Sequence, residues 1–170
     1  MLRRCVFVTA VMSASLLACG GAPAPHQPAS STRQSIARRE LPTELQPLVP
    51  RHGAVTTGGG VKSPVFRVIV DTDAKTIYTG SAPAGSTLAG KLPAERTREL
   101  TPANEHHLMQ LCADAWSEPA PVTAPERVAG YNEYLIVADG DEIFFVDGRG
   151  PITRPAAARA IEALRAAGAL

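Results

Sequence analysis

Regular hydrophobic patterning in this 170-residue chain begins only near Val65, and this limits what the chain can fold into. Before that point, residues 20–60 are rich in proline, glycine and serine and show no sustained apolar period. Segments of this kind bury too little apolar surface to offset the entropy lost on ordering. The sequence therefore predicts a flexible tether over residues 19–60, dispensable for folding, and one compact domain over residues 61–170.

Two pairs of β-strands are predicted in this domain. Residues 65–70 form a β-branched run, and residues 75–79 return after a turn at residues 71–74. In the second pair, residues 131–138 and 142–146 are joined by Asp139-Gly140, whose glycine tolerates the positive φ of a tight hairpin turn. These patterns indicate two antiparallel hairpins.

Two helices are predicted, one after each hairpin. Thr101 as N-cap and Pro102 in the first turn open a helix whose apolar stripe ends near Trp116. Thr153 caps the last helix, with Pro155 in its first turn. The expected order β-β-α-β-β-α gives an α+β fold with both helices on one face of the strands.

The N-terminal residues have the features of a signal peptide. Two arginines precede an apolar run over residues 5–17, which is shorter than the roughly 20 residues of a spanning helix. The run ends in Leu16-Leu17-Ala18-Cys19, which resembles the bacterial lipobox. The resemblance implies a lipoprotein signal peptide over residues 1–18, cleavage before Cys19, diacylglycerol on the Cys19 thiol, and an amine open to acylation.

An ordinary secretory signal is the alternative, with its cleavage site near residues 22–24. Two or more acyl chains, palmitate among them, hold a protein stably on a membrane, so a lipidated Cys19 predicts an anchored envelope protein. Gly20 stands where an aspartate would retain a Gram-negative lipoprotein at the inner membrane. The expected location is therefore the outer membrane, with the domain in or beside the periplasm.

The charge balance argues against a nucleic-acid partner. The chain has 17 basic and 16 acidic residues, a formal net charge of +1, and its basic residues are dispersed. Nucleic-acid binding draws much of its affinity from the neutralisation of phosphates by clustered basic residues. We therefore expect a protein or cell-wall partner.

No catalytic or metal-binding pattern is readable, and we expect no metal or other cofactor. His106 and His107 are adjacent on a helix, about 100° apart, and lack the i, i+4 spacing of a metal pair. Cys112 lies on the apolar stripe, which predicts a buried thiol rather than a nucleophile. Turn or exposed strand positions, rather than a calcium site, are predicted for the acidic residues Asp71, Asp73, Asp139, Asp141, Glu142 and Asp147.

Neither the glycine-rich segment over residues 57–63 nor the large amphipathic side chains define a functional site. Residues 57–63 depart from a phosphate-binding loop because Val61 separates the last glycine from Lys62. The large amphipathic side chains either lie in the core or anchor a protein contact; they are Tyr78, Trp116, Tyr131 and Tyr134.

The element order over residues 64–167 resembles that of emfourin-type proteinase inhibitors: a hairpin, a helix opened by Leu100-Thr101-Pro102, a proline-rich loop, a second hairpin and a closing helix. The resemblance implies inhibitory activity but assigns it to no residue. We expect a non-enzymatic, membrane-anchored binding module, of which an inhibitor is one form. The alternative is a small extracytoplasmic enzyme, whose site would bring a histidine and two carboxylates into one pocket.

Overall fold

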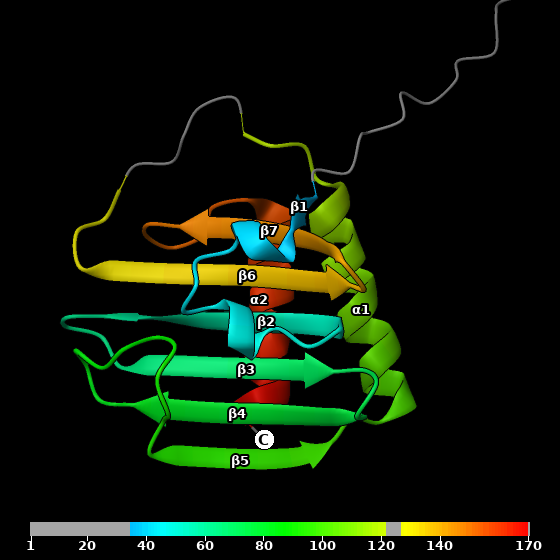
Figure 1. Cartoon of the computed structure of the whole chain (residues 1–170), viewed down its shortest axis with the longest axis horizontal. Helices are drawn as coiled ribbons and strands as arrows, with labels where there is room; N and C mark the ends of the chain where they lie inside the picture. Colours follow the sequence, from blue (N-terminus) through cyan, green and yellow to red (C-terminus); the bar gives the residue numbers. More distant parts are fainter. Residues whose placement is uncertain (1–34, 122–126, 170) are drawn as a thin grey trace, which may run out of the picture. The chain divides into compact units, whose positions relative to one another are not determined.

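In the computed structural model, which describes residues 35–121 and 127–169, an antiparallel seven-stranded sheet carries both helices on one face (Figure 1). The predicted signal peptide and Cys19 lie outside these described residues. Within them, no helix is long and apolar enough to cross a membrane. The α+β class and the shared face of the two helices are confirmed.

The strands are β1 (Ile36–Ala37), β2 (His52–Gly60), β3 (Val65–Asp71), β4 (Thr76–Ala82), β5 (Ala94–Glu99), β6 (Tyr131–Asp139) and β7 (Glu142–Gly148). The helices are α1 (Pro102–Ser117) and α2 (Pro155–Ala169), with short 3-10 helices η1 (Arg38–Glu40) and η2 (Gln46–Leu48). The strand order in the sheet is β1-β7-β6-β2-β3-β4-β5. The two predicted hairpins are β3–β4 and β6–β7, but two hairpins are too few, because β1, β2 and β5 complete the sheet.

The predicted tether is wrong for residues 35–60, because these residues belong to the folded domain. β2 lies at the centre of the sheet, paired with β3 on one side and β6 on the other, and residues 53–59 are buried. A Cβ on Gly58 would lie 2.7 Å from the Phe66 ring on β3. This glycine therefore marks a close approach within a sheet, where the sequence suggested a linker.

β5 is another strand that the sequence pattern failed to indicate. Leu92 is buried in the loop before this strand. β5 itself has the sequence Ala-Glu-Arg-Thr-Arg-Glu, and most of its side chains are exposed. Since it has no apolar face of its own, hydrophobic alternation could not reveal it.

Both faces of the sheet are packed. On the helix face, α1 and α2 cover a large core that includes Leu108, Leu135, Phe144 and Leu164. The opposite face, here called the front face, is covered by residues 38–50, whose Leu41, Leu45 and Val49 pack on Val55, Ile136, Ala138 and Ile143. Figure 1 shows this segment in front of the sheet and α2 behind it.

The helix ends follow the sequence signals in part. Thr101 caps α1 as predicted, since its hydroxyl accepts the Asn104 amide at 3.4 Å. Thr153 does not cap α2, which begins at Pro155. The Glu118 carboxylate, just beyond α1, accepts the amides of Ala156 and Ala157 at 3.1 and 3.4 Å instead. A residue distant in the sequence therefore supplies the cap.

Candidate functional site

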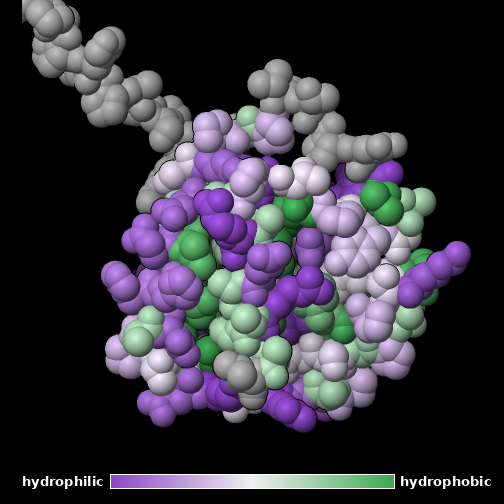
Figure 2. All heavy atoms as spheres, turned by 180° about the vertical axis from the view of Figure 1, so that it is seen from behind, coloured by the Kyte–Doolittle hydropathy of each residue, from purple (hydrophilic) through white to green (hydrophobic). Residues whose placement is uncertain are grey.

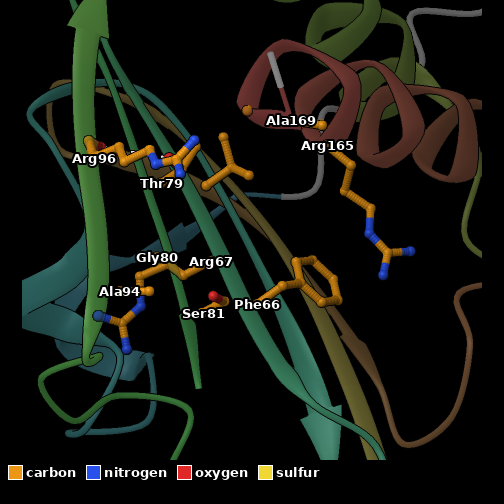
Figure 3. Close-up of a pocket in the computed structure, with 11 residues that line it drawn as sticks. Phe66, Arg67, Thr79, Gly80, Ser81, Ala94, Arg96, Arg165 and Ala169 are labelled. Carbon is orange, nitrogen blue, oxygen red and sulfur yellow. Dashed lines mark hydrogen bonds between the residues drawn. The ribbon is translucent and has the colours of Figure 1, made fainter. Parts of the chain in front are cut away.

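A hollow of about 370 Å³ lies on the helix face of the sheet, beside the last turn of α2 and beside β5. We call it the α2–β5 groove, and its lining residues are Phe66, Arg67, Val68, Thr79, Gly80, Ser81, Ala94, Arg96, Arg165, Gly168 and Ala169. Figure 3 shows Arg96 projecting from β5 on one side and Arg165 projecting from α2 on the other. The groove thus combines an apolar floor with two guanidinium groups.

Arg165 is held in place by two contacts. Its guanidinium carbon lies 3.8 Å from the centroid of the Phe66 ring, within the range of a cation–π interaction. One guanidinium nitrogen lies 3.7 Å from the buried Glu133 carboxylate, which also accepts the Ile152 amide at 3.0 Å. Burial, together with Glu133, raises the pKa of the neighbouring Tyr131 phenol. Because Glu133 is fixed by the backbone, it fixes the position of Arg165.

Arg96 is the second cation of the groove, and its side chain is exposed. Its backbone carbonyl accepts the Thr79 hydroxyl at 3.4 Å, but its guanidinium has no hydrogen-bond or ion-pair partner among the described residues. Arg98, two residues further along the same face of β5, donates to the Gly168 carbonyl at 3.0 Å and so fixes the end of α2 beside the strand. Arg96 is therefore available to a ligand, whereas Arg98 is engaged.

Arg67 lines the groove, but its guanidinium lies on the front face of the sheet. Its guanidinium donates to the carbonyls of Leu88 and Gly90, and burial lowers its pKa. The loop over residues 83–93 is thereby held on the front face, where Leu92 packs with Val65 and Ala82. This loop supports the sheet beneath the groove from its other side.

The surface around the groove is mixed in polarity. Figure 2 views the molecule from the helix side and shows hydrophobic patches lying between hydrophilic side chains, without one continuous apolar face. Two arginines beside an apolar floor suit a ligand that carries a carboxylate next to apolar atoms, since guanidinium groups pair with carboxylates in a fork geometry.

A second hollow of about 280 Å³ lies beside α1, where the sheet ends at His52 and Asp139. The His52 Nδ1 atom lies 2.9 Å from the Asp73 carboxylate, and Glu105 also lines the hollow. His52 and two carboxylates, Glu105 and Asp139, line this hollow, while Asp73 contacts the histidine without lining it. Glu105 is occupied by Lys75 at 2.8 Å. Within residues 35–121 and 127–169, the His52 ring hydrogen-bonds only to Asp73, so no hydroxyl or thiol is hydrogen-bonded to it.

The residues that the sequence singled out are mostly dispersed. His106 and His107 are exposed on α1, and Cys112 is buried, as predicted; burial raises the pKa of its thiol to about 12. Trp116 is a core residue, stacked on Phe144 with centroids 6.0 Å apart, whereas three tyrosines are half-buried: Tyr78, Tyr131 and Tyr134.

The acidic residues occupy turn or exposed strand positions, as predicted, but the turn of the second hairpin consists of Gly140 and Asp141 rather than Asp139 and Gly140, because Asp139 pairs with Glu142. Asp71 accepts the amides of Asp73 and Ala74 in the turn between β3 and β4. The acidic residues of the second hairpin are all exposed: Asp139, Asp141, Glu142 and Asp147. In the part of the chain that the structure describes, no three His, Cys, Asp or Glu side chains are placed to hold a metal ion. Residues 57–60 are part of β2, and a turn follows at residues 61–63.

Comparison with known proteins adds no relative. No family model matches the chain, no curated protein is significantly similar to it, and no solved structure matches its fold. The resemblance to emfourin-type inhibitors therefore stays a prediction.

Sequence reasoning missed the residues that form the groove and the second hollow. His52 lay in the supposed tether, and Phe66 and Arg165 meet only after the chain has folded. A signal did exist in residues 94–99, where basic and acidic residues occupy alternate positions. An alternation of charge sign with period two is what a strand with two different faces would show.

Proposed function

We propose that this chain is a membrane-anchored bacterial envelope lipoprotein whose domain is a non-enzymatic binding module for an acidic segment of a protein partner. The observation that carries the proposal is the placement of Arg96 and Arg165 on opposite sides of the α2–β5 groove. The lipobox resemblance at Cys19 supports the anchor, and Gly20 supports the outer membrane. A proteinase inhibitor is a narrower form of the same proposal, supported by the element order alone.

The electrostatics of the groove favour an anion over a cation or a neutral ligand. Arg165 is partly neutralised by Glu133, while Arg96 keeps its full charge and faces solvent. A hydrogen bond to a charged group contributes about 1.5–3 kcal/mol when its partners are well placed, and rim charges also raise the association rate. Both arginines are exposed to solvent, so the affinity of the groove for one carboxylate is modest and its selectivity depends on several contacts together.

A peptide titration tests this proposal. The mature lipidated chain, kept in detergent, is titrated with a labelled glutamate-rich peptide and with the matching glutamine peptide. We expect the glutamate peptide to bind at least about tenfold more tightly, which corresponds to about 1.4 kcal/mol. Arg96→Ala should remove this preference, whereas Arg159→Ala, an exposed residue elsewhere on α2, should retain it. Equal binding of the two peptides would overturn the proposal.

Anchoring is tested separately by mass spectrometry of the chain extracted from membranes. We expect an N-terminal peptide that begins at Cys19 and carries acyl chains. A mature chain that begins at any other residue would refute the anchor but leave the groove proposal in place.

A small extracytoplasmic enzyme is the second candidate, and the His52–Asp73 pair favours it. A carboxylate on Nδ1 orients an imidazole so that Nε2 can act as a general base. An enzyme of this kind should hydrolyse a simple activated ester such as 4-nitrophenyl acetate, and His52→Ala should abolish this activity while Arg96→Ala leaves it intact. Equal rates for the wild type and His52→Ala would exclude this role for His52.

A further inference from the structure

We propose that the acidic segment binds as an additional β-strand on the free edge of β5, with acidic side chains on the helix face and basic side chains on the front face. This inference rests on the proposed function and adds the conformation and the charge pattern of the ligand. Four features of β5 carry it: its place in the sheet, the direction of its backbone groups, its charges and the adjoining groove.

β5 is an edge strand whose outer side is open. It stands last in the sheet and, among the described residues, pairs only with β4. The Leu100 amide donates to the Lys75 carbonyl at 2.9 Å, just beyond the last paired residues Glu99 and Thr76. Hydrogen-bonded pairs alternate along an antiparallel ladder.

This alternation fixes which backbone groups of β5 are free. Arg98 and Arg96 lie two and four residues before Leu100, so their backbone amides and carbonyls, like the Leu100 amide, point toward β4. Their partners there are Ile77 and Thr79. The amides and carbonyls of Glu95, Thr97 and Glu99 therefore point outward from the sheet. An unpaired row of this kind can accept a partner strand.

The two faces of β5 carry opposite charges. Side chains alternate between faces along a strand, so Arg96 and Arg98 lie on the helix face, where Arg98 contacts Gly168 of α2. Glu95 and Glu99 lie on the front face, where Glu95 accepts the amide of Leu92. A strand added to this edge meets positive charge on one face and negative charge on the other.

A second copy of the chain does not fit this edge. In a two-fold dimer through β5 the strands pair antiparallel, and residues opposite each other lie on the same face. Arginines would then face arginines, and glutamates would face glutamates. Like charges directly opposite destabilise a strand pair, so the charge pattern protects the edge from self-association. A strand with acidic residues on one face and basic residues on the other has the complementary pattern.

The α2–β5 groove adjoins the same face as the arginines. An acidic side chain on the helix face lies beside Arg96, and the apolar floor at Phe66 is available to a larger neighbouring side chain. A shift of register by one residue would exchange the two faces of the added strand and bring like charges together. The charge pattern therefore selects the register as well as the ligand.

The experiment compares two peptides of about six residues. In the alternating peptide, glutamate and lysine alternate; in the block peptide, the same residues are grouped by charge. Both are titrated into the mature lipidated chain, and hydrogen exchange of residues 94–99 is followed. We expect the alternating peptide to bind about tenfold more tightly and to slow exchange in β5.

Two variants test the strand edge directly. Thr97→Pro removes an outward amide but no bond to β4, and proline is tolerated on edge strands; we expect about tenfold weaker binding of the alternating peptide. Thr97→Val keeps the amide and should bind as the wild type does. Should Thr97→Pro not fold, Glu99→Lys reverses one front-face charge and should weaken the alternating peptide but not a peptide that alternates glutamate and threonine.

The outcomes separate this inference from the proposed function. If both peptides bind equally and Thr97→Pro has no effect, while Arg96→Ala still weakens binding, the strand addition is wrong and the anion-binding groove stands. If neither peptide nor the glutamate-rich peptide binds, both proposals are overturned. Protection of residues 94–99 that rises with chain concentration, without peptide, would show self-pairing and also overturn the inference.

Discussion

Single residues determine the groove through contacts that run across the sheet. Gly58 on β2 leaves space for the Phe66 ring of β3, Phe66 supports the Arg165 guanidinium of α2, and Glu133 of β6 holds the same guanidinium from the side. The two contacts of Arg165 join residues far apart in the sequence. The position of one cation in the groove therefore depends on correct pairing of three strands and on the packing of α2.

Cys112 gives a prediction about alkaline stability. Burial raises the pKa of its thiol from 9.0 to about 12. Because the folded pKa lies above the unfolded value, the buried neutral thiol stabilises the fold fully below about pH 9, and this contribution is lost as the pH rises toward 12. The free energy of unfolding should therefore fall over this range, by at most about 1.4 kcal/mol per pH unit from this group.

Urea denaturation at a series of pH values measures this effect, with Cys112→Ala as the control. The variant should be less stable near pH 7 because it loses packing, but its stability should fall less steeply above pH 9. The free energy of unfolding of Cys112→Ala should still fall somewhat with pH, since burial and a hydrogen bond to Glu95 also raise the pKa of Tyr78 to about 12. Identical slopes for the two chains would contradict the burial of the thiol.

At the scale of the elements, the strands and helices with strong local signals were predicted correctly. β3 and β7 have β-branched or aromatic runs, the β6–β7 turn has Gly140 at positive φ, and α1 has its Thr101 cap. β2 and β5 could not be found in this way. β2 is rich in glycine because its neighbours come close, and β5 is charged on both faces because it lies at the edge.

The candidate site was less predictable than the fold. Hydrophobic periodicity reports which residues are buried, whereas the groove is made of exposed arginines from β5 and α2 that come together only in the tertiary structure. The charge alternation over residues 94–99 was visible, but its meaning depends on knowing that these residues form an edge strand. The burial of Cys112 and the position of Asp71 at a turn could be predicted because each follows from local pattern.

The link between the two helices yields a second prediction. Glu118 caps α2 from the end of α1, and Arg154 contacts the same carboxylate at 3.5 Å. Glu118→Ala should lower the free energy of unfolding by about 1–2 kcal/mol, because two amides lose their acceptor. Thr153→Ala, at the position that the sequence suggested for the cap, should change stability by less than about 0.5 kcal/mol. Equal losses in the two variants would contradict this assignment.

At the scale of the whole molecule, the folded unit includes residues that look like a linker. A chain that begins at residue 61 lacks β2, and β3 and β6 then have no strand between them. We expect such a chain to show no cooperative unfolding transition, because the centre of the sheet is missing. A chain that begins at residue 35 should unfold at nearly the same urea concentration as the mature chain. Similar midpoints for all three chains would contradict the central position of β2.

The most direct measurement of the groove's role is a reversal of charge on both partners. Arg96→Glu places a carboxylate where the wild type has a free guanidinium on the exposed side of the groove. We predict that this variant binds the glutamate-rich peptide at least about tenfold more weakly than the wild type does. It should also bind the matching lysine peptide more tightly, since opposite charges attract and like charges repel across the same contact. If Arg96→Glu bound the glutamate-rich peptide as tightly as the wild type does, the ligand would not lie in the α2–β5 groove.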